Sequence, residues 1–551
     1  MLLAGVAVWE FGLKRPAASP NIILIVLDTE RADHVSCSGA SARATTPFLD
    51  TLADKGLVFP QARSPSNWTL PAHASIFTGL LPSEHGCHFE HRYLVDEALT
   101  VAEFLQGQGY VTAGFSCNVN IGRAFNLTQG FDTYEEIWGD AQATAGAQSG
   151  DVLETRLAAW LRDPPGRPVF LFLNLMDAHL PYRAATGFEG HFGAPGEGFP
   201  ADLLDQPDFL DRVLMGEQQL DGLFKADLTL LYDNAIRGLD ARLQRVHSLL
   251  SKAGFLDYSV LIVTSDHGEN LGDHGLVDHQ ASLHETVLRV PLILQGSGIP
   301  PGEVIDTPVS TCALYFWIQD MQRNAFRPDL IRENQVLISE RMQPVALLER
   351  MVGLSAADRQ RIGGRELAAL FSGRGLKLLR QEGLPDRVVR VRADRIDAEE
   401  LNTQEALELL PELTAALSAR LRDRRVLREG DGPDPQQAED LSGAFERMRQ
   451  LGYLSAGVQS GFSVHAQEHL SRGVRAYRED DLAAALEEFE RAAAIQPGFA
   501  DALFNVALVV DRLGRPDARE RWERYLDAAL KTNDQDQGSL QHAYERLDQL
   551  R

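Results

Sequence analysis

Four short apolar runs stand out in the first half of the chain. They are NIILIVLD (21–28), GYVTAGFSCN (109–118), PVFLFLNLMDAH (168–179) and YSVLIVTSDHG (258–268). Three of them are nearly uninterrupted in Val, Ile, Leu and Phe, which is typical of parallel strands covered on both faces, and helical patterns lie between them. The pattern predicts a doubly wound α/β domain, in which ligands bind beyond the carboxyl ends of the strands.

Weaker patterns follow this domain. The runs LKLLRQEG (376–383) and RVVRVRAD (387–394) are typical of two strands of a hairpin-like piece. TQEALELLPELTAALSARLRDRR (403–425) has the periodicity of an amphipathic helix. Together they predict an appended α+β subdomain. REGDGPDPQQAED (428–440) is rich in Gly, Pro and charge, which indicates a linker.

The chain beyond this linker is alanine-rich and has helical periodicity. Small residues, aromatic residues and a proline fall at the spacing of a tetratricopeptide repeat, and a weaker second copy spans 500–530; an ordinary helical hairpin is the alternative. Two repeats bury little surface alone, so we expect this all-α module to pack on the rest of the chain or on a protein partner. The matching residues are Gly473, Tyr477, Ala485, Phe489, Ala492 and Pro497.

The N-terminus begins with a short apolar run that is interrupted by Glu10. It is too short to span a bilayer, so it is either a mobile tail or the end of a membrane anchor or signal that starts further upstream. The predicted divisions are this tail (1–17), the catalytic α/β domain (18–325), its α+β subdomain (326–425), the linker (426–462), the repeats (463–531) and a C-terminal helix or tail (532–551).

Composition narrows the class of protein. Asp and Glu number 78 against 53 Lys and Arg, and the net charge of −25 leaves no basic surface in bulk to neutralise phosphates, which argues against a nucleic-acid binder. The four cysteines, Cys37, Cys87, Cys117 and Cys312, are too few and too scattered for a disulfide framework or a thiolate metal cluster.

Polar side chains end two of the predicted strands. Asp28 closes the first run, and Asp266 and His267 close the last. Carboxylate and imidazole ligands at converging strand ends predict a site for one divalent metal ion. Each residue alone could instead cap a helix or pair with an arginine, but a nearby nucleophile candidate favours the metal site.

That candidate is Thr69, in the run NWTLPAHASIFTG. Thr69 is predicted to be the N-cap of a helix with Pro71 in its first turn, where free backbone N–H groups favour an anion such as phosphate or sulfate. His73 lies one turn further on the same helix face and can reach the same anion or its leaving group. Because a hydroxyl is a poor nucleophile by itself, we expect Thr69 to be a metal ligand as well.

These residues resemble a known family. PNIILIVLDTERADH, the T-x-P-x-H run ending in FTG, GLLPSEHG, and TSDHGENLGDHGL followed by LRVPLIL are similar to the sulfatase branch of the alkaline phosphatase superfamily, in order over about residues 18–425. The resemblance implies an alkaline-phosphatase-like α/β fold, a divalent metal (Ca, Mn or Zn), and attack by Thr69 on a sulfate or phosphate ester. It also implies a periplasmic or otherwise extracytoplasmic location.

The departures from the family are chemically important. Sulfatases carry at position 69 a cysteine or serine that is oxidised to formylglycine, an aldehyde that threonine cannot form. The family's arginine is replaced by His73, its second acidic residue by Thr29, and its later lysine by His279. FSCNVN lacks the usual lysine and histidine and leaves Asn118 as a candidate substrate ligand. Anion-binding cations are thus largely replaced by imidazoles.

Threonine nucleophiles resemble those of phosphodiesterases and of phosphoglycerol and phosphoethanolamine transferases, which favours phosphoryl chemistry. In one reading His179 and His279 bind the substrate anion beside a single metal, with His179 also catalytic; in the other, Asp177 joins them to hold a second ion. A covalent Thr69 intermediate is resolved by water or by an acceptor alcohol. A third possibility is a catalytically weak ester-binding domain that serves the repeats.

The expected substrate is a small-molecule, glycan or lipid ester, and the N-terminus allows membrane association. The remaining histidines are given lesser roles. His274 is expected to support the metal pair, His85 to form a structural turn, and Arg289 to pair structurally. Packing or surface positions are expected for His34, His88, His91 and His284.

Overall fold

The computed structural model describes most of residues 19–550. The predicted N-terminal tail and the predicted linker (426–462) lie outside the described residues. Within 19–550, the segments left out are 39–42, 89–90, 140–147, 198, 201, 207–208, 215, 280, 332–334, 342–365, 382–383, 423–465, 467–468, 471, 474–475, 478–480, 496–498 and 532–536.

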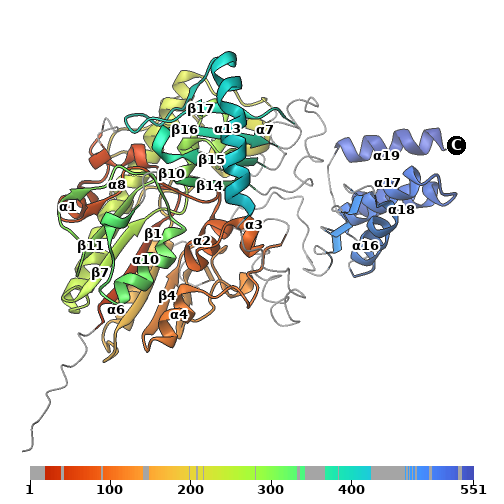
Figure 1. The fold of residues 1–551 in the computed structure, drawn as a ribbon. Coiled ribbons are helices and arrows are strands. Elements are labelled where there is room, and N and C mark those ends of the chain that lie inside the picture. The colour runs from red at the N-terminus through yellow and green to blue at the C-terminus, as the bar shows by residue number, and fades with distance from the viewer. Residues whose placement is uncertain are drawn as a thin grey trace, which may run out of the picture.

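An eight-stranded sheet forms the centre of the catalytic body, in the order β12-β2-β11-β7-β1-β6-β4-β5 (Figure 1). The four predicted runs are its central parallel strands, β7 (Ser259–Thr264), β1 (Asn21–Leu27), β6 (Val169–Leu175) and β4 (Val111–Ser116). All four are buried because helices cover both faces, as their uninterrupted apolar sequences predict. The edge strands are β5 (Thr133–Glu136) and β12 (Glu303–Val304). Between β12 and β7 lie β2 (Leu57–Val58) and β11 (Leu292–Gly296), and β11 is antiparallel to β7.

Alternate residues of β1 point into two different cores. Ile22 and Leu24 face α2, α4 and α10, whereas Ile23 and Ile25 face α1, α6 and α8. The predicted doubly wound architecture is therefore confirmed. The helices of this body are α1 (Pro47–Ala53), α2 (Thr69–Thr78), α3 (Pro82–His85), α4 (Val101–Gly107), α6 (Ser149–Trp160), α7 (Phe209–Leu214), α8 (Gly222–Lys252), α9 (Glu285–Leu288) and α10 (Ala313–Gln322).

Two small sheets accompany the large one. In the first, β3 (Ala62–Arg63) lies between β10 (Arg289–Val290) and β13 (Val309–Ser310). The second pairs β8 (Asn270–Leu271) with β9 (Val277–Asp278). The second sheet lies in the segment that follows the core strand β7.

The subdomain after this body is a five-stranded antiparallel sheet with α13 (Thr403–Arg422) packed along it (Figure 1). The two predicted strands correspond to β16 (Leu376–Gln381) and β17 (Arg387–Arg390). The expectation of a hairpin-like piece was incomplete, because β14 (Val336–Arg341), β15 (Glu366–Phe371) and β18 (Glu399–Glu400) are also present. VLISER and ELAALF are too short and too ordinary in pattern to stand out alone.

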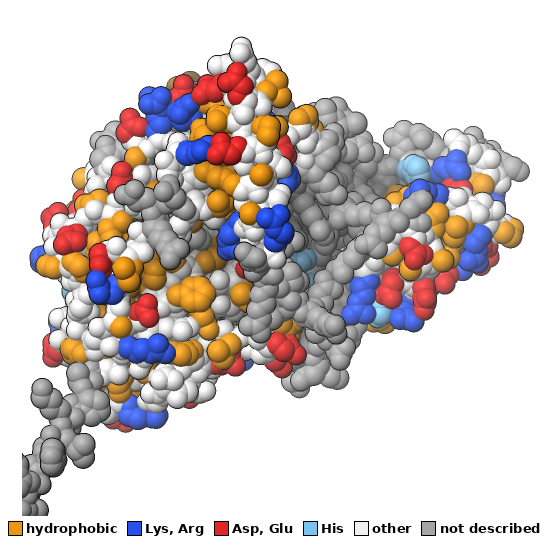
Figure 2. Space-filling model, viewed as in Figure 1, with side chains coloured by type: hydrophobic (Ala, Val, Ile, Leu, Met, Phe, Trp, Pro, Cys, Tyr) orange, Lys and Arg blue, Asp and Glu red, His pale blue; other side chains and the backbone are white. Residues whose placement is uncertain are grey.

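The C-terminal helical module has a core of its own, built around Phe489 and Trp522. A Cβ atom on Gly473 would lie 2.5 Å from the ring of Phe489, so a small residue is needed where the helical segment of Gly473 touches the helix of Phe489. On the face seen in Figure 2, basic and acidic side chains of this module are interspersed. Its helices are α16 (Leu482–Ile495), α17 (Ala500–Arg512), α18 (Ala518–Lys531) and α19 (Gln537–Gln549).

Among the helices in the described part of the chain, none has both the length and the apolar character needed to cross a bilayer.

Candidate active site

Two neighbouring strands bring the predicted metal ligands together. Asp28 follows β1 directly, and Asp266 and His267 follow β7, which pairs with β1 in parallel register. One ligand atom from each of the three residues lies within 4.8 Å of the others, and all three side chains are buried. The side chains at the carboxyl ends of β1 and β7 therefore converge, as expected.

The two carboxylates each leave one oxygen without a hydrogen-bond partner. Asp28 Oδ2 accepts hydrogen bonds from Asn118 Nδ2 at 2.8 Å and from Asn174 Nδ2 at 3.1 Å, while Asp28 Oδ1 has no hydrogen-bond partner. Asp266 Oδ1 accepts from the His267 backbone N at 3.0 Å, and Asp266 Oδ2 has no hydrogen-bond partner. Because unpaired carboxylate oxygens are costly in a protein interior, this arrangement fits a bound divalent cation.

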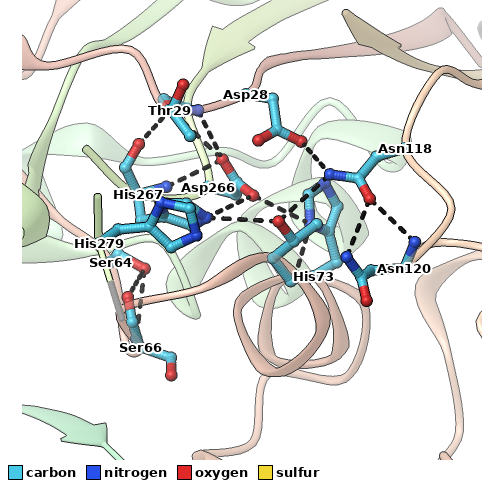
Figure 3. A network of polar contacts seen from close by, with 12 residues as sticks. Asp28, Thr29, Ser64, Ser66, His73, Asn118, Asn120, Asp266, His267 and His279 are labelled. Atoms are coloured by element: carbon cyan, nitrogen blue, oxygen red, sulfur yellow. Dashed lines mark hydrogen bonds and ion pairs between the residues drawn. The ribbon is translucent and has the colours of Figure 1, made fainter. Parts of the chain in front are cut away.

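His267 is oriented as a neutral ligand. Its Nδ1 donates to the Gly268 carbonyl at 2.9 Å, so Nε2 carries the lone pair, and Nε2 lies 3.4 Å from Thr69 Oγ1. Figure 3 shows His267 beside Asp266 and His279. Burial, with His279 nearby, lowers the pKa of His267 well below its ordinary value. Gly268 permits this turn, because a Cβ there would lie 2.1 Å from the Thr286 carbonyl oxygen.

Thr69 is not the N-cap that the sequence predicts. Helix α2 begins at Thr69 itself, the preceding Trp68 is in the cap position, and no side chain caps the helix. Pro71 did not fix the start, because proline is tolerated throughout a first turn whose N–H groups have no helical partner. The buried Thr69 hydroxyl instead faces His267 and, at 3.3 Å, Asn118 Nδ2.

The segment before Thr69 is held by the C-terminal subdomain. In β14, Ser339 Oγ donates to the Ser64 carbonyl at 2.7 Å, and the Glu340 backbone N donates to the Pro65 carbonyl at 2.8 Å. These contacts join β14 to the chain just ahead of α2. The position of Thr69 therefore depends on residues that are far away in sequence.

His73 lies on the predicted helix face but does not contact the Thr69 hydroxyl. Its Nδ1 donates to the Thr69 carbonyl oxygen at 2.9 Å and lies 3.5 Å from Asp266 Oδ2. His73 Nε2 is buried without a hydrogen-bond partner. The imidazole thus extends the metal cluster and offers one unpaired nitrogen.

His279 stands against the cluster from the other side. Its ring lies 4.2 Å from the His267 ring and 5.4 Å from that of His179, between centroids. His279 Nδ1 is 2.6 Å from Asp278 Oδ1 and 3.3 Å from Glu269 Oε1. Burial alone would lower the pKa of His279, but these two carboxylates raise it well above its ordinary value.

Asp177 does not join this cluster, so the predicted second ligand set of Asp177, His179 and His279 is not assembled. Strand β6 ends at Leu175, and Asp177 lies in the following turn, where its Oδ1 accepts from Arg242 Nε at 2.8 Å. Arg242 is fully buried. The carboxylate therefore stabilises a structural arginine, and strand alternation did not apply at its position.

The residues beside His279 were not singled out from the sequence. Glu269 and Asp278 form with His279 a second buried group of potential metal-binding side chains. Asn120 and Asn174 complete the hydrogen bonds around Asn118 and Asp28. The sequence could have indicated these four residues by their position, since each lies within a few residues of a predicted strand end or ligand.

The other histidines and Arg289 have structural contacts. His274, expected to support the metal pair, is exposed and its ring stacks on His284 at 3.8 Å between centroids. His85 Nε2 lies 3.1 Å from Ser75 Oγ, in agreement with a structural turn. The remaining contacts are His34 with Asp233, the His88–His91 backbone bridge, and Arg289 with the carbonyls of Pro60 and Ala393.

Comparisons with known proteins agree with this geometry. A family model described as Sulfatase matches residues 20–317. The multifunctional alkaline phosphatase superfamily protein PehA of Trinickia caryophylli is 24% identical over 354 residues, 50% of this chain and 68% of the relative. A sulfatase of Formosa agariphila is 22% identical over 368 residues, which are 55% of this chain and 69% of the relative. The phosphonate monoester hydrolase of Agrobacterium radiobacter has a similar fold, with a TM-score of 0.56 and 18% identity over 73% of this chain and 96% of that one.

Proposed function

Because this chain belongs to the sulfatase family, within the alkaline phosphatase superfamily, we propose that it is a metal-dependent ester hydrolase with Thr69 as its nucleophile. We propose further that phosphoesters are preferred over sulfate esters. The observation that carries the proposal is the uncapped, buried Thr69 hydroxyl, 3.4 Å from His267 and beside two carboxylates with unpaired oxygens.

Asp28, Asp266 and His267, with the Thr69 hydroxyl, are the residues that would hold the ion. When bound, a divalent cation would favour the ionised form of the hydroxyl and neutralise charge on the ester. The chain supplies two carboxylates and one neutral imidazole, a donor set that suits Zn or Mn and is short of oxygens for Ca.

The chain's own residues define the rest of the reaction. Thr69 Oγ gives up its proton to a base of the site and forms a bond to phosphorus, the bond to the leaving oxygen breaks, and the leaving oxygen takes up a proton as the alcohol departs. Water then gives up a proton and forms a bond to phosphorus, the bond to Thr69 Oγ breaks, and Oγ regains a proton. The N–H groups at the start of α2 and the protonated His279 favour the anionic ester, and the imidazoles of His73 and His179 are the groups that we assign to proton transfer.

The preference for phosphoesters follows from the residue at position 69. A secondary alcohol cannot form the formylglycine aldehyde, so the covalent intermediate has to be released by attack of water or of another alcohol on the central atom. This is ordinary phosphoryl chemistry. PehA and the Agrobacterium hydrolase, whose names include a multifunctional activity and a phosphonate monoester, support that direction.

Substrate and location are proposed at a coarser level. A small-molecule, glycan or lipid ester suits the site, and a protein partner could bind the tetratricopeptide-like module. An extracytoplasmic location is supported by relatives such as the extracellular sulfatase SULF-1 homolog of Drosophila melanogaster. Membrane association through the N-terminus stays a prediction.

The proposal is tested with purified protein, bound metal measured by mass spectrometry, and a panel of an aryl sulfate, a phosphate monoester, a phosphate diester and a phosphonate monoester. We expect Thr69→Ala to lower kcat on the best substrate by about 10⁴-fold, as loss of a catalytic nucleophile does. Thr69→Ser should retain part of the activity, and its unfolding temperature serves as the folding control.

Acid quenching during turnover should trap a phosphorylated Thr69 peptide in the wild type and none in Thr69→Ala. Added glycerol or ethanolamine distinguishes hydrolysis from transfer, because a transferase forms a new ester with the alcohol. The proposal would be overturned if the wild-type protein retained no metal and Thr69→Ala had the same activity as the wild type.

A further inference from the structure

Two asparagine side chains form a hydrogen-bonded chain behind the nucleophile. Asn118 Nδ2 lies 2.8 Å from Asp28 Oδ2 and 3.3 Å from Thr69 Oγ1. On the far side, Asn118 Oδ1 accepts from the Asn120 backbone N at 2.9 Å and from Asn120 Nδ2 at 3.2 Å. Figure 3 shows Asn118 placed between Asp28 and Asn120.

Chemistry fixes which atoms donate and which accept in these hydrogen bonds. A backbone N–H can only donate, so the Asn118 atom facing the Asn120 backbone must be the carbonyl oxygen, and the amide NH₂ must face Asp28 and Thr69. The backbone is also held, because the Asn118 N donates to Ser116 Oγ at 3.2 Å. Asn118 is 0% exposed and Asn120 is 8% exposed, so water does not compete strongly for these bonds.

The amide has no hydrogen left for a substrate. An NH₂ group has two hydrogens, and in Asn118 one is directed to Asp28 and the other to Thr69. A substrate oxygen could gain a bond from Asn118 only by displacing one of these contacts. The role expected from the sequence, a substrate ligand at Asn118, is therefore not the one that the hydrogen bonds favour.

We propose that Asn118 acts on the nucleophile: its N–H orients Thr69 Oγ and stabilises the charge that develops there, and Asn120 is the positioning residue that holds Asn118. This rests on Thr69 being the nucleophile. The contact makes Thr69 Oγ an acceptor, so the hydroxyl's own proton points elsewhere and can leave. A hydrogen bond to a charged oxygen is roughly twice as strong as one to a neutral oxygen, so the stabilisation grows as the reaction begins.

The same amide links the nucleophile to a metal ligand. Asn118 and Asn174 both donate to Asp28 Oδ2, which leaves Oδ1 as the oxygen that is free to bind a cation. Removing Asn118 could therefore act through Asp28 and the metal as well as through Thr69. The experiment has to separate these routes from each other and from substrate binding.

Steady-state kinetics of Asn118→Ala on the best substrate of the panel make the first separation. We expect kcat to fall by about 10²-fold, the usual effect of losing one such donor. KM should stay within about two-fold, since Asn118 does not bind the substrate. The rise in unfolding temperature produced by inorganic phosphate should also persist. A higher KM with unchanged kcat, together with loss of the phosphate effect, would instead make Asn118 a substrate ligand and overturn the proposal.

Asn120→Ala tests the positioning role, because Asn120 touches Asn118 and not the nucleophile. We expect kcat to fall by roughly 10-fold, within the range typical of residues that support an active-site group. The double variant should be no slower than Asn118→Ala alone, since both changes remove the same stabilisation. Multiplicative effects would show that the two residues act independently and would overturn the coupling. Asn402→Ala, at the start of α13, is the matched asparagine control and should keep the wild-type kcat.

Metal titrations complete the separation. If excess metal restores the kcat of Asn118→Ala, the residue acts through Asp28 and the proposal for Thr69 is wrong. If kcat stays low at saturating metal, the effect lies on the nucleophile. If the wild type is inactive, or if its activity does not depend on Thr69, the proposed function itself is contradicted. If the wild type is active and its activity depends on Thr69, but Asn118→Ala has the wild-type kcat, only this inference is contradicted.

Discussion

A hydroxyl at the start of a helix can be used for capping or for chemistry. Thr69 is the first residue of α2, so the helix begins one residue earlier than expected, and no side chain makes a cap hydrogen bond. Its oxygen is therefore directed to Asn118 and His267. A shift of one residue decides this, because only the cap residue can turn its side chain back onto the helix N–H groups.

Carboxylates near the site also differ in role according to their partners. Asp266 has an oxygen without a hydrogen-bond partner, whereas Asp177 is paired with the buried Arg242. Burial makes both costly to leave unpaired, and a metal ion and an arginine are alternative solutions. Their sequence settings, each just after a buried strand, are alike.

Matched variants should separate the two roles. We expect Asp266→Asn to lose most of the bound metal, since one of two carboxylate ligands disappears. Asp177→Asn should keep wild-type metal content but lower the free energy of unfolding by about 1–2 kcal/mol, because Arg242 retains Asp151 and Glu154 as partners. Metal analysis and urea denaturation measure both effects. Metal loss in Asp177→Asn would contradict the assignment.

At the scale of elements, a short helix joins the two parts of the catalytic body. Glu285, the first residue of α9, accepts from Arg63 Nε of β3 at 3.0 Å and from Lys377 Nζ of β16 at 2.8 Å. Burial alone would raise the pKa of Glu285, but Arg63 and Lys377 lower it to about 2. Strand β3 continues toward Thr69, so this buried ion cluster helps to place the nucleophile segment.

The cluster predicts a pH-dependent stability. The pKa of Glu285 is lowered on folding from 4.5 to about 2, so its contribution is present above pH 4.5 and is lost as the pH falls from 4.5 to about 2. We expect Glu285→Gln to cost about 3 kcal/mol at pH 7, from the size of this shift. Urea unfolding at several pH values should show the difference from wild type shrinking below pH 4.5.

Glu412 provides the control for that measurement. It pairs with Arg374 at 2.6 Å on the surface, where salt and water weaken ion pairs. Glu412→Gln should therefore leave stability unchanged within error at every pH. If Glu285→Gln behaved in the same way, the buried cluster would not be an important support of the fold.

At the scale of the whole molecule, the described residues of the helical module have a hydrophobic core that does not include the candidate site. All the candidate site residues lie between Asp28 and His279, and the cores of the catalytic body contain residues no later than Leu421. The module has its own core, which starts at Ala466. We therefore expect that the module does not take part in bond cleavage.

A chain that ends after Arg425 tests this separation. We expect it to keep kcat/KM within about two-fold on soluble substrates, because no candidate site residue is lost. Its unfolding temperature should lie close to that of the catalytic transition in the full chain. A folded, truncated protein with activity reduced more than about 10-fold would show that the module contributes to the site.

The sequence alone determined the central sheet and predicted three residues that the structure brings together as a potential metal-binding group. Asp28, Asp266 and His267 could be placed because buried parallel strands have a strong local signature and their carboxyl ends must converge. Thr69 stood out through the helix that follows it. These are local patterns, readable within about ten residues.

Only the tertiary structure decided which side chains pair. Asp177 meets Arg242 across 65 positions, Lys377 meets Glu285 across 92, and Asn118 meets Thr69 across 49. No periodicity encodes such contacts, because they depend on how distant segments pack and on which buried polar groups find partners. Sequence therefore located the candidate site, while packing decided whether each polar residue there contacts the potential metal ligands, the Thr69 hydroxyl or a structural partner.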